Sequence, residues 1–343
     1  MTKPALSTLL EARNALAGTR LWVLTDGKMG DLAQCLGVAE RLGLSVIEKV
    51  VKPRAPWLWL MPLSWRIPLL AIDPKEKPGA SGSPLQGPWP DIVIASGRRA
   101  APYLPAIKRA SGGRTFTVFL KDPRTSADIA DFIWVPDHDR LRGPNVMPTL
   151  TSPHRITPEM LAELRNHPPE GLARLTKPRV AVLIGGNSKD FRFEAGDITR
   201  FTEALERLAQ SGAGLMATAS RRTPPALEAA AHAVITAAGG YFWDGSGENP
   251  YRALLANADA LVVTAESVNM VGEAVSTGKP VLVFRPTGAS RKIDQFLRGL
   301  EEKGAIRPFS GALEDYSYEP MDATPAIALE LARRYMAFSE RRQ

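Results

Sequence analysis

The sequence predicts an α/β protein built from two Rossmann-like, doubly wound domains that face a cleft. Its 343 residues exceed the roughly 100 to 200 residues of a single domain. Apolar runs alternate with glycine-containing turns and helical patterns, as in parallel sheets that helices cover on both faces. In addition, the sequence Ala-Asp-Phe-Ile-Trp-Val at 130–135 is echoed by Ala-Asp-Ala-Leu-Val-Val at 258–263. This echo indicates two halves of similar construction.

The first half opens on a strand, a turn and a helix. The apolar run at 21–25 predicts the strand, and the turn Asp26–Gly30 follows it. Apolar residues then recur every three to four positions over 31–42, which predicts the helix. Further strands are predicted at 45–51, 91–96, 115–120 and 132–135. These runs are almost continuously apolar, so we expect strands that are buried on both faces.

The second half begins in the same way, with a strand at 179–184, a turn at 185–188 and a helix at 197–210. Its other strands are predicted at 215–218, 260–264 and 281–284. Five prolines at 153–178 predict a linker between the halves. The predicted order is therefore a first domain at 1–152, a linker at 153–178, a second domain at 179–323 and a terminal helix at 324–343.

Composition excludes several classes of protein. The chain has 43 Lys and Arg against 36 Asp and Glu, a net charge of +7, and its scattered cations form no basic stripe for nucleic acid. The single Cys35 excludes an intrachain disulfide framework and fits a reducing compartment. Residues 1–20 lack the continuous apolar core of a secretory signal. We therefore expect a cytoplasmic protein whose mild positive charge suits anionic small molecules or an anionic membrane surface.

The most apolar segment is 56–72, which Pro62, Arg66 and Pro68 interrupt. It is shorter than the roughly 20 apolar residues that span a bilayer. Three of the seven tryptophans lie in it, namely Trp57, Trp59 and Trp65. Because Trp favours membrane interfaces, two interpretations stay open. The segment packs on the core, or it makes a peripheral contact with the inner face of the membrane, where a lipid-linked acceptor would lie.

The segment 257–285 carries the most informative chemical pattern. A strand ends at Thr264, a polar turn with Glu266 and Ser267 follows, and a helix then contains Asn269 and Glu273. A helix N-terminus beside the carboxyl end of a strand offers backbone N–H groups and a positive dipole end, which suit a diphosphate. A carboxylate about one turn into that helix suits the two hydroxyls of a ribose. We assign this role to Glu273.

This segment resembles the nucleotide-sugar-binding segment of GT-B glycosyltransferases and of the non-hydrolysing UDP-N-acetylglucosamine 2-epimerases. In those families an acidic residue precedes an apolar strand, a Ser/Gly turn follows, a helical Glu binds ribose, and Gly-x-Pro precedes the next strand. The residues that fall on this pattern are Asp259, Ser267, Glu273, Gly278 and Pro280. The turn departs from it, because Glu266-Ser267-Val268-Asn269 stands where the families carry one or two glycines. This departure puts the phosphate contacts, or the activity itself, in question.

The chain as a whole resembles the mitochondrial-fission ELM family over about residues 20 to 310. The matching pieces are Leu24–Gly27 with Gly30 and Gln34, Ser96–Arg99, Asp122–Arg124, Pro136–Asp139 with Asn145 and Val146, Gly185–Ser188, and Glu266–Pro280. The resemblance implies a GT-B-like architecture and leaves the reaction undefined.

Two further turns of the second half are candidates for binding the nucleotide sugar. The first consists of Gly185, Gly186, Asn187 and Ser188, and it either presents backbone N–H groups to a phosphate or is a plain tight turn. Ser220 and Arg221 follow the next strand. The guanidinium there either clamps a diphosphate or belongs to a solvated basic turn.

The first half supplies candidates for catalysis and acceptor binding. Asp26 is the candidate general base for an acceptor hydroxyl, or else it caps the helix that follows. His138, which stands between two aspartates, is a second candidate for proton transfer. The candidate acceptor-binding residues are Gly27, Gly30, Arg98, Arg99 and Asp122.

No metal site or other cofactor is expected, because the four His residues are scattered without the spacing of zinc ligands. The motifs of P-loop proteins and of serine hydrolases are absent from the sequence. The favoured function is a metal-independent glycosyltransferase that moves a sugar from a nucleotide to an unknown acceptor. A nucleotide-sugar epimerase of the same fold and a non-catalytic, membrane-associated binding protein stay open as alternatives.

Overall fold

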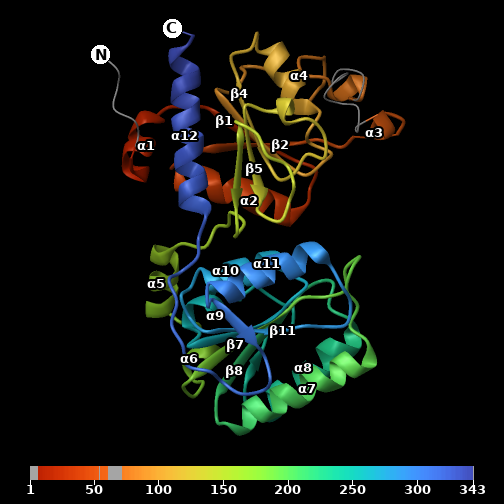
Figure 1. The fold of residues 1–343 in the computed structure, drawn as a ribbon, viewed down its shortest axis with the longest axis vertical. Helices are drawn as coiled ribbons and strands as arrows, with labels where there is room; N and C mark the ends of the chain where they lie inside the picture. The colour runs from red at the N-terminus through yellow and green to blue at the C-terminus, as the bar shows by residue number, and fades with distance from the viewer. Residues whose placement is uncertain (1–6, 54, 61–71, 343) are drawn as a thin grey trace. The chain divides into compact units, whose positions relative to one another are not determined.

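The computed structural model describes residues 7–53, 55–60 and 72–342. The chain divides into two compact units, the first made of residues 1–155 and 323–343, and the second of residues 156–322 (Figure 1). Each unit contains one six-stranded sheet, and all strand pairs within both sheets are parallel. The predicted α/β class with two Rossmann-like, doubly wound domains is confirmed, whereas the cleft between them stays a prediction.

The sheet of the first unit has the strand order β2-β1-β3-β4-β5-β6. Its strands are β1 (Leu21–Thr25), β2 (Val46–Val50), β3 (Ile92–Ser96), β4 (Phe116–Leu120), β5 (Phe132–Pro136) and β6 (Val146–Thr149). The chain places β2 on one side of β1 and all later strands on the other. The winding therefore reverses between β1 and β3, and in open α/β sheets ligands bind at such a switch point.

Helices cover both faces of this sheet. The helices of this unit are α1 (Leu9–Ala15), α2 (Met29–Arg41), α3 (Trp57–Leu60), α4 (Tyr103–Ala110) and α12 (Thr324–Glu340), with short 3-10 turns η2 (Pro74–Glu76) and η3 (Ala127–Ile129). Leu21 and Val23 pack with α1, α2 and α12, whereas Trp22 and Leu24 pack with α4 on the other face. Burial on both faces explains why the strands are continuously apolar.

The sheet of the second unit has the order β12-β11-β10-β7-β8-β9. Its strands are β7 (Arg179–Ile184), β8 (Gly214–Ala219), β9 (Tyr241–Phe242), β10 (Ala260–Thr264), β11 (Val281–Phe284) and β12 (Ile306–Pro308). Numbered from β7, this is the Rossmann order 3-2-1-4-5-6, so its switch point lies between β7 and β10.

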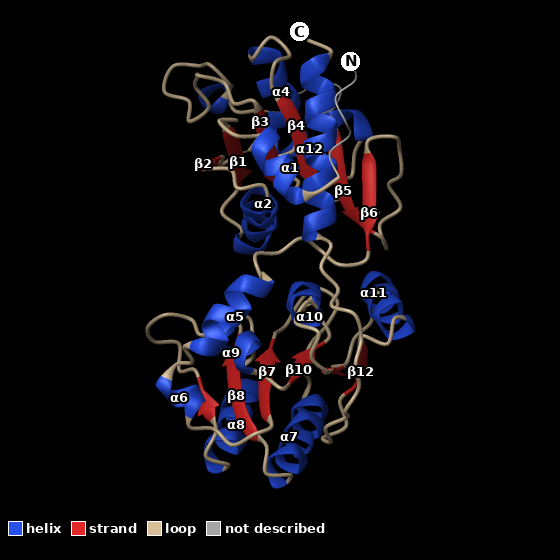
Figure 2. Cartoon of the chain, turned by 90° about the vertical axis from the view of Figure 1, so that its left-hand side faces the viewer, coloured by secondary structure: helices blue, strands red, loops and turns tan. Residues whose placement is uncertain are grey.

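Helices also cover both faces of the second sheet. They are α5 (Pro158–Asn166), α6 (Glu170–Ala173), α7 (Ala195–Gln210), α8 (Pro225–Ala237), α9 (Tyr251–Asn257), α10 (Val268–Val275) and α11 (Arg291–Glu302). Figure 2 shows α7 and α8 below the strands of this unit and α10 and α11 above them. The buried side chains of α7 and α8 pack on Val180, Val182 and Val262. Because the strands are parallel, their carboxyl ends lie at the same edge of the sheet. At this edge, turns lead from strands into helices.

The region predicted as a linker differs from that expectation. Residues 156–178 belong to the second unit, and α5 within them packs against α9. Two of the prolines occupy helix starts, since Pro158 is in the first turn of α5 and Pro169 is the N-cap of α6. Proline is tolerated there because the first N–H groups of a helix have no partner within it. The terminal helix α12 packs on the first unit.

The Trp-rich segment is described only in part. Trp57 and Trp59 lie in α3, and Trp59 is 74% exposed, while Trp65 lies outside the described residues. Among the helices in the described part of the chain, none combines the length and the apolar character needed to cross a bilayer.

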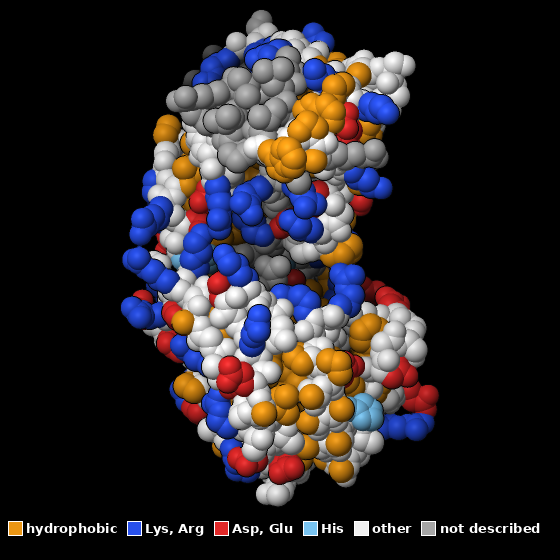
Figure 3. Space-filling model, turned by 90° about the vertical axis from the view of Figure 1, so that its right-hand side faces the viewer, with side chains coloured by type: hydrophobic (Ala, Val, Ile, Leu, Met, Phe, Trp, Pro, Cys, Tyr) orange, Lys and Arg blue, Asp and Glu red, His pale blue; other side chains and the backbone are white. Residues whose placement is uncertain are grey.

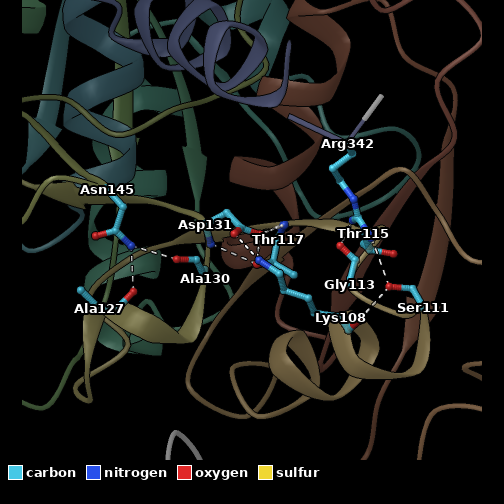
Figure 4. Close-up of polar contacts among 10 residues, drawn as sticks. All are labelled: Lys108, Ser111, Gly113, Thr115, Thr117, Ala127, Ala130, Asp131, Asn145 and Arg342. Carbon is cyan, nitrogen blue, oxygen red and sulfur yellow. Dashed lines mark hydrogen bonds and ion pairs between the residues drawn. The ribbon is translucent and has the colours of Figure 1, made fainter. Parts of the chain in front are cut away.

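The echo between residues 130–135 and 258–263 corresponds to a shared hydrogen-bond motif. Asp131 Oδ2 accepts from the backbone N–H and the hydroxyl of Thr117 at 2.9 and 2.8 Å, and the Asp131 N–H donates back to the Thr117 carbonyl (Figure 4). Asp259 makes the same reciprocal contact with the backbone of Arg179 at 2.8 Å. In each case an aspartate just before a strand fixes the start of that strand against its parallel neighbour.

We expect Asp131→Ala to lower the free energy of unfolding by about 2 to 3 kcal/mol. The substitution leaves two donors of Thr117 without their acceptor and also removes the ion pair of Asp131 with Lys108. Urea unfolding measures the loss. Asp128→Ala is the matched control, because Asp128 is exposed and its carboxylate accepts from the hydroxyl of Ser126; an equal effect of both substitutions would contradict the proposed role.

Candidate functional site

The candidate site of the second unit lies at the carboxyl ends of β7, β8 and β10. Three turns meet there, because the carboxyl ends of parallel strands share one edge of a sheet. They are Gly185–Glu194 after β7, Ser220–Pro224 after β8, and Ala265–Ser267 after β10. The turns after β7 and β10 flank the switch point of this sheet.

Gly185 and Glu266 are in direct contact at this switch point. The Gly185 N–H donates to Thr264 Oγ1 at 2.8 Å, and that hydroxyl donates to Glu266 Oε1 at 3.0 Å. A Cβ on residue 185 would lie 1.8 Å from Glu266 Oε1. Only glycine leaves room for the carboxyl here, so the Glu266 side chain occupies the space beside the turn.

Glu266 is buried, with 5% of its surface exposed. Its Oε2 atom has no hydrogen-bond partner among the described residues. Burial raises the pKa of this carboxyl, and the backbone of residues 186 and 266, the Thr264 hydroxyl and the Arg222 cation oppose the rise. The site therefore contains a buried acid whose ionised form is costly.

Gly186 is required by a different contact. A Cβ on residue 186 would lie 2.1 Å from the backbone carbonyl of Arg222 and 2.4 Å from the Thr223 nitrogen. The Asn187 N–H donates to the Arg222 carbonyl at 3.1 Å, and Thr223 Oγ1 donates to the Gly185 carbonyl at 2.5 Å. The turns after β7 and β8 are thus hydrogen-bonded to each other.

The predicted polar residues of these turns also hold their own loops. Asn187 Oδ1 accepts from the Phe193 N–H at 2.9 Å, and Ser188 Oγ accepts from the Phe191 N–H at 3.1 Å. Ser220 Oγ accepts from the Arg222 N–H. Arg221 is exposed. Asn187 is exposed as well, and Arg221 is the predicted residue that adds an exposed cation to this edge.

The helix α10 begins at this edge with Ser267 as its N-cap residue. The Ser267 side chain makes no capping hydrogen bond, and Ser267 is buried while Asn269 is exposed. An N-terminus of this kind carries a partial positive charge and suits an anion.

Glu273 lies in the second turn of α10 and is half-buried. Its Oε2 accepts from the Tyr251 hydroxyl at 2.5 Å. Burial raises the pKa of Glu273 to about 7, although the Tyr251 hydrogen bond and the Arg252 cation favour the ionised form. Tyr251 is at the start of α9, which follows β9, so two elements at the same edge hold this carboxylate.

A hollow elsewhere on the second unit is a separate feature. It has a volume of about 490 Å³ and is lined by Glu206, Ala209, Gln210, Ala233, Val234, Ala237 and Ala238. Figure 3 shows hydrophobic side chains gathered on this part of the unit. The lining comes from the carboxyl ends of α7 and α8, at the opposite edge of the sheet from the turns. The hollow is therefore not part of the candidate site.

The first unit has a comparable constellation at its own switch point. Gly97, which follows β3, has a φ of +84°, and a Cβ on it would lie 2.7 Å from Asp31 Oδ2. Asp31 is in the first turn of α2 and pairs with Lys121 at 2.7 Å. Asp26 follows β1; its side chain is 2% exposed, and its Oδ2 lies 3.4 Å from Lys28 Nζ without hydrogen-bond geometry.

The other predicted residues of the first unit are spread over its edge. Gly27 and Gly30 are exposed beside the start of α2, Arg98 and Arg99 are exposed after β3, and Asp122 Oδ1 accepts from the Arg124 N–H in the turn after β4. His138 follows β5, which β3 and β4 separate from β1. At about 4.8 Å per strand, the ends of β1 and β5 are roughly 14 Å apart. Asp26, and not His138, therefore lies at the switch point.

Sequence reasoning missed several residues of both sites. They are Thr223, Tyr251 and Thr264 in the second unit and Asp31 and Lys121 in the first. A threonine at the end of a strand, such as Thr264, could have been recognised from the sequence. Its hydroxyl both donates and accepts, so it can link a neighbouring glycine turn to another side chain. Among the described residues, no group of three or more His, Cys, Asp and Glu could hold a metal ion.

Comparison with known proteins gives a family. A sequence model of the family described as mitochondrial fission ELM1 matches residues 29–335. The mitochondrial fission protein ELM1 of Arabidopsis thaliana is 26% identical over 393 residues, which cover 93% of this chain and 91% of the relative. An uncharacterized protein of Rickettsia prowazekii is 28% identical over 286 residues, which cover 70% of this chain and 78% of the relative. The family match includes Gly97, Gly185 and Glu266.

Two solved structures are similar to this chain over most of its length. MurG of Acinetobacter baumannii has a TM-score of 0.43 and 13% identity, covering 93% of this chain and 95% of that one. The UDP-GlcNAc 2-epimerase of Neisseria meningitidis, bound to UDP-GlcNAc, has a TM-score of 0.46 and 12% identity, covering 93% of this chain and 90% of that one.

We expect Gly185→Ala to destabilise the protein by about 1 to 3 kcal/mol, because its Cβ displaces the Glu266 carboxyl. Combining it with Glu266→Ser should remove most of that cost. Gly186→Ala is the matched control, since its Cβ meets the backbone of Arg222 and Thr223, and the same second substitution should not rescue it. Urea unfolding of the six proteins measures the coupling, and equal rescue of both alanines would contradict the assignment.

The raised pKa of Glu273 predicts a pH dependence of stability. Because the folded protein holds this proton more tightly than the unfolded chain, the stabilisation is full below pH 4.5 and is lost as the pH rises through about 7. Relative to Glu273→Gln, which does not titrate, the wild type should lose up to about 3 kcal/mol between pH 5 and 8. Unfolding at several pH values measures this difference, and a constant difference would refute the assignment.

Proposed function

This chain belongs to the mitochondrial fission ELM1 family, and from that premise we propose that its second unit binds a nucleotide sugar at the β7/β10 switch point. The observation that carries the proposal is the position of Glu273 on α10. That helix begins at the switch point without a side-chain cap, and Glu273 lies in its second turn. A diphosphate at the helix N-terminus would place the attached ribose one turn along, beside this carboxylate.

Recognition of the ribose rests on the pair of Glu273 and Tyr251. The Tyr251 hydroxyl fixes Oε2 at 2.5 Å, so the carboxylate is held in one orientation and Oε1 is left to accept from the ribose hydroxyls. The resemblance of 257–285 to the donor segment of GT-B glycosyltransferases supports the same assignment. The exposed guanidinium of Arg221 would contact the diphosphate.

The proposed reaction is transfer of the sugar to an acceptor hydroxyl. The acceptor oxygen forms a bond to the anomeric carbon, and the bond from that carbon to the phosphate oxygen breaks. The hydroxyl proton passes to a carboxylate base, for which Asp26 is the candidate from the sequence, and the nucleoside diphosphate leaves. The dipole of α10 and the cation of Arg221 would stabilise the leaving charge without a metal ion.

Calorimetric titration with UDP-, GDP-, ADP-, CMP- and dTDP-linked sugars tests the proposal. For the nucleotide that binds, Glu273→Ala should weaken binding by about 1.5 to 3 kcal/mol, which is roughly 10- to 100-fold. Tyr251→Phe should weaken it less, because the carboxylate remains but loses its orientation.

Glu206→Ala is the matched control, since it removes one exposed acid of the same unit at the opposite edge of the sheet. Its affinity should equal that of the wild type. The proposal fails if no nucleotide sugar binds, or if Glu273→Ala binds as tightly as the control. Inversion of the bound sugar without an acceptor would instead identify an epimerase.

A further inference from the structure

We infer that the Glu266 carboxyl occupies the place beside the Gly185 turn that a phosphate of the ligand needs, so that an anionic ligand must displace or neutralise it to bind. This inference rests on the proposed function and adds to it that a side chain of the protein competes with the ligand for the phosphate position. Glu266 would then set which ligands the site admits and how tightly it holds them.

The first step of the argument is steric. Glu266 Oε1 would be 1.8 Å from a Cβ on residue 185, so the carboxyl oxygen lies against the backbone of the turn. The Thr264 hydroxyl holds it there with a 3.0 Å hydrogen bond. A phosphate oxygen that approached the same stretch of backbone would meet the carboxyl first.

The second step concerns the donors of the turn. The Gly185 N–H is committed to Thr264 Oγ1 at 2.8 Å, and the Asn187 N–H is committed to the Arg222 carbonyl at 3.1 Å. The backbone of residues 186 and 266 acts on the Glu266 carboxyl and favours its ionised form. The Gly185 and Asn187 N–H groups are thus used within the protein, and the backbone of residue 186, which a glycine turn could offer to phosphate, acts on the internal anion.

The third step concerns the cost of this arrangement. Glu266 is 5% exposed, and its Oε2 has no hydrogen-bond partner among the described residues. Burying an oxygen of a carboxyl without a partner is unfavourable. Arg222 is the charged group that acts on this carboxyl, and its side chain is exposed to solvent. The carboxyl is thus held weakly enough to be exchanged for a ligand that supplies better contacts.

The fourth step is electrostatic. A ligand phosphate at the start of α10 would lie next to residue 266, because that residue directly precedes the N-cap of the helix. Two like charges so close together, one of them on a buried side chain, repel each other more strongly than they would in bulk water. Displacement of the side chain, or protonation of its carboxyl, relieves this repulsion.

The test compares the wild type with Glu266→Ser, which removes bulk and charge, and Glu266→Gln, which removes charge alone. Calorimetry at pH 8 would measure binding of inorganic pyrophosphate, which has no ribose to contact Glu273, and of UDP. We expect Glu266→Ser to bind both ligands at least about tenfold more tightly than the wild type, with Glu266→Gln between the two. Thermal unfolding would show that each variant is folded.

Asp190→Asn is the matched control, because it removes one exposed negative charge from the same turn without touching the space beside Gly185. Its affinity should change by less than about twofold, since solvent and salt screen an exposed charge. If UDP binds the wild type and both Glu266 variants equally, the inference is overturned and the proposed function stands. If Glu266→Ser tightens pyrophosphate alone and no nucleotide sugar binds, the inference stands and the proposed function falls. If no variant binds pyrophosphate, UDP or any nucleotide sugar of the panel above, both are overturned.

Discussion

The Gly185 amide, which donates to the Thr264 hydroxyl at 2.8 Å, joins the two strands between which the second sheet reverses its winding. At a switch point, the loops that follow the two neighbouring strands run to opposite faces of the sheet. The carboxyl ends of these two strands are therefore not covered by a crossover helix. Thr264 fills part of that gap, because its hydroxyl accepts from the turn and donates to Glu266. The position of α10, and with it that of Glu273, follows from this contact, since only three residues lie between Thr264, which ends the strand, and Val268, which begins the helix.

Most of the fold could be predicted because its strands are buried on both faces. The apolar runs at 21–25, 179–184 and 260–264 coincide with β1, β7 and β10. The strands β6, β9 and β12 were not predicted. They consist of four, two and three residues, and β9 and β12 are the outermost strands of their sheet. The strands β9 and β12 are too short to show an apolar run. The strand β6 contains a proline and is fully buried only at Val146, so it shows no apolar run either.

The site could be predicted in its location and less well in its contacts. A glycine turn after one strand and a polar turn after another identified the β7/β10 edge, because parallel strands bring such turns together. The sequence could not show that Asn187 and Ser188 close their own loop, since these side chains serve a loop or a ligand equally well. The sequence also could not show that the Glu266 side chain lies against the turn after β7. That contact is possible because Gly185, 81 positions earlier in the chain, has no Cβ. The direction of a side chain in a turn depends on tertiary contacts, and these leave no periodic pattern in the sequence.

Both sheets solve the same steric problem in the same way, and the difference between them bears on function. At each switch point a glycine follows a strand and a carboxylate oxygen lies against it, Asp31 against Gly97 in the first unit and Glu266 against Gly185 in the second. In the first unit, Lys121 pairs with the carboxylate at 2.7 Å, so the charge is balanced and the arrangement is stable by itself. In the second unit one oxygen of the carboxyl has no hydrogen-bond partner among the described residues. Asp26 Oδ2, at the first switch point, also has no hydrogen-bond partner among the described residues. The contrast therefore concerns the two carboxyls that lie against the glycines, and it favours Glu266 over Asp31 as the one that a ligand anion displaces.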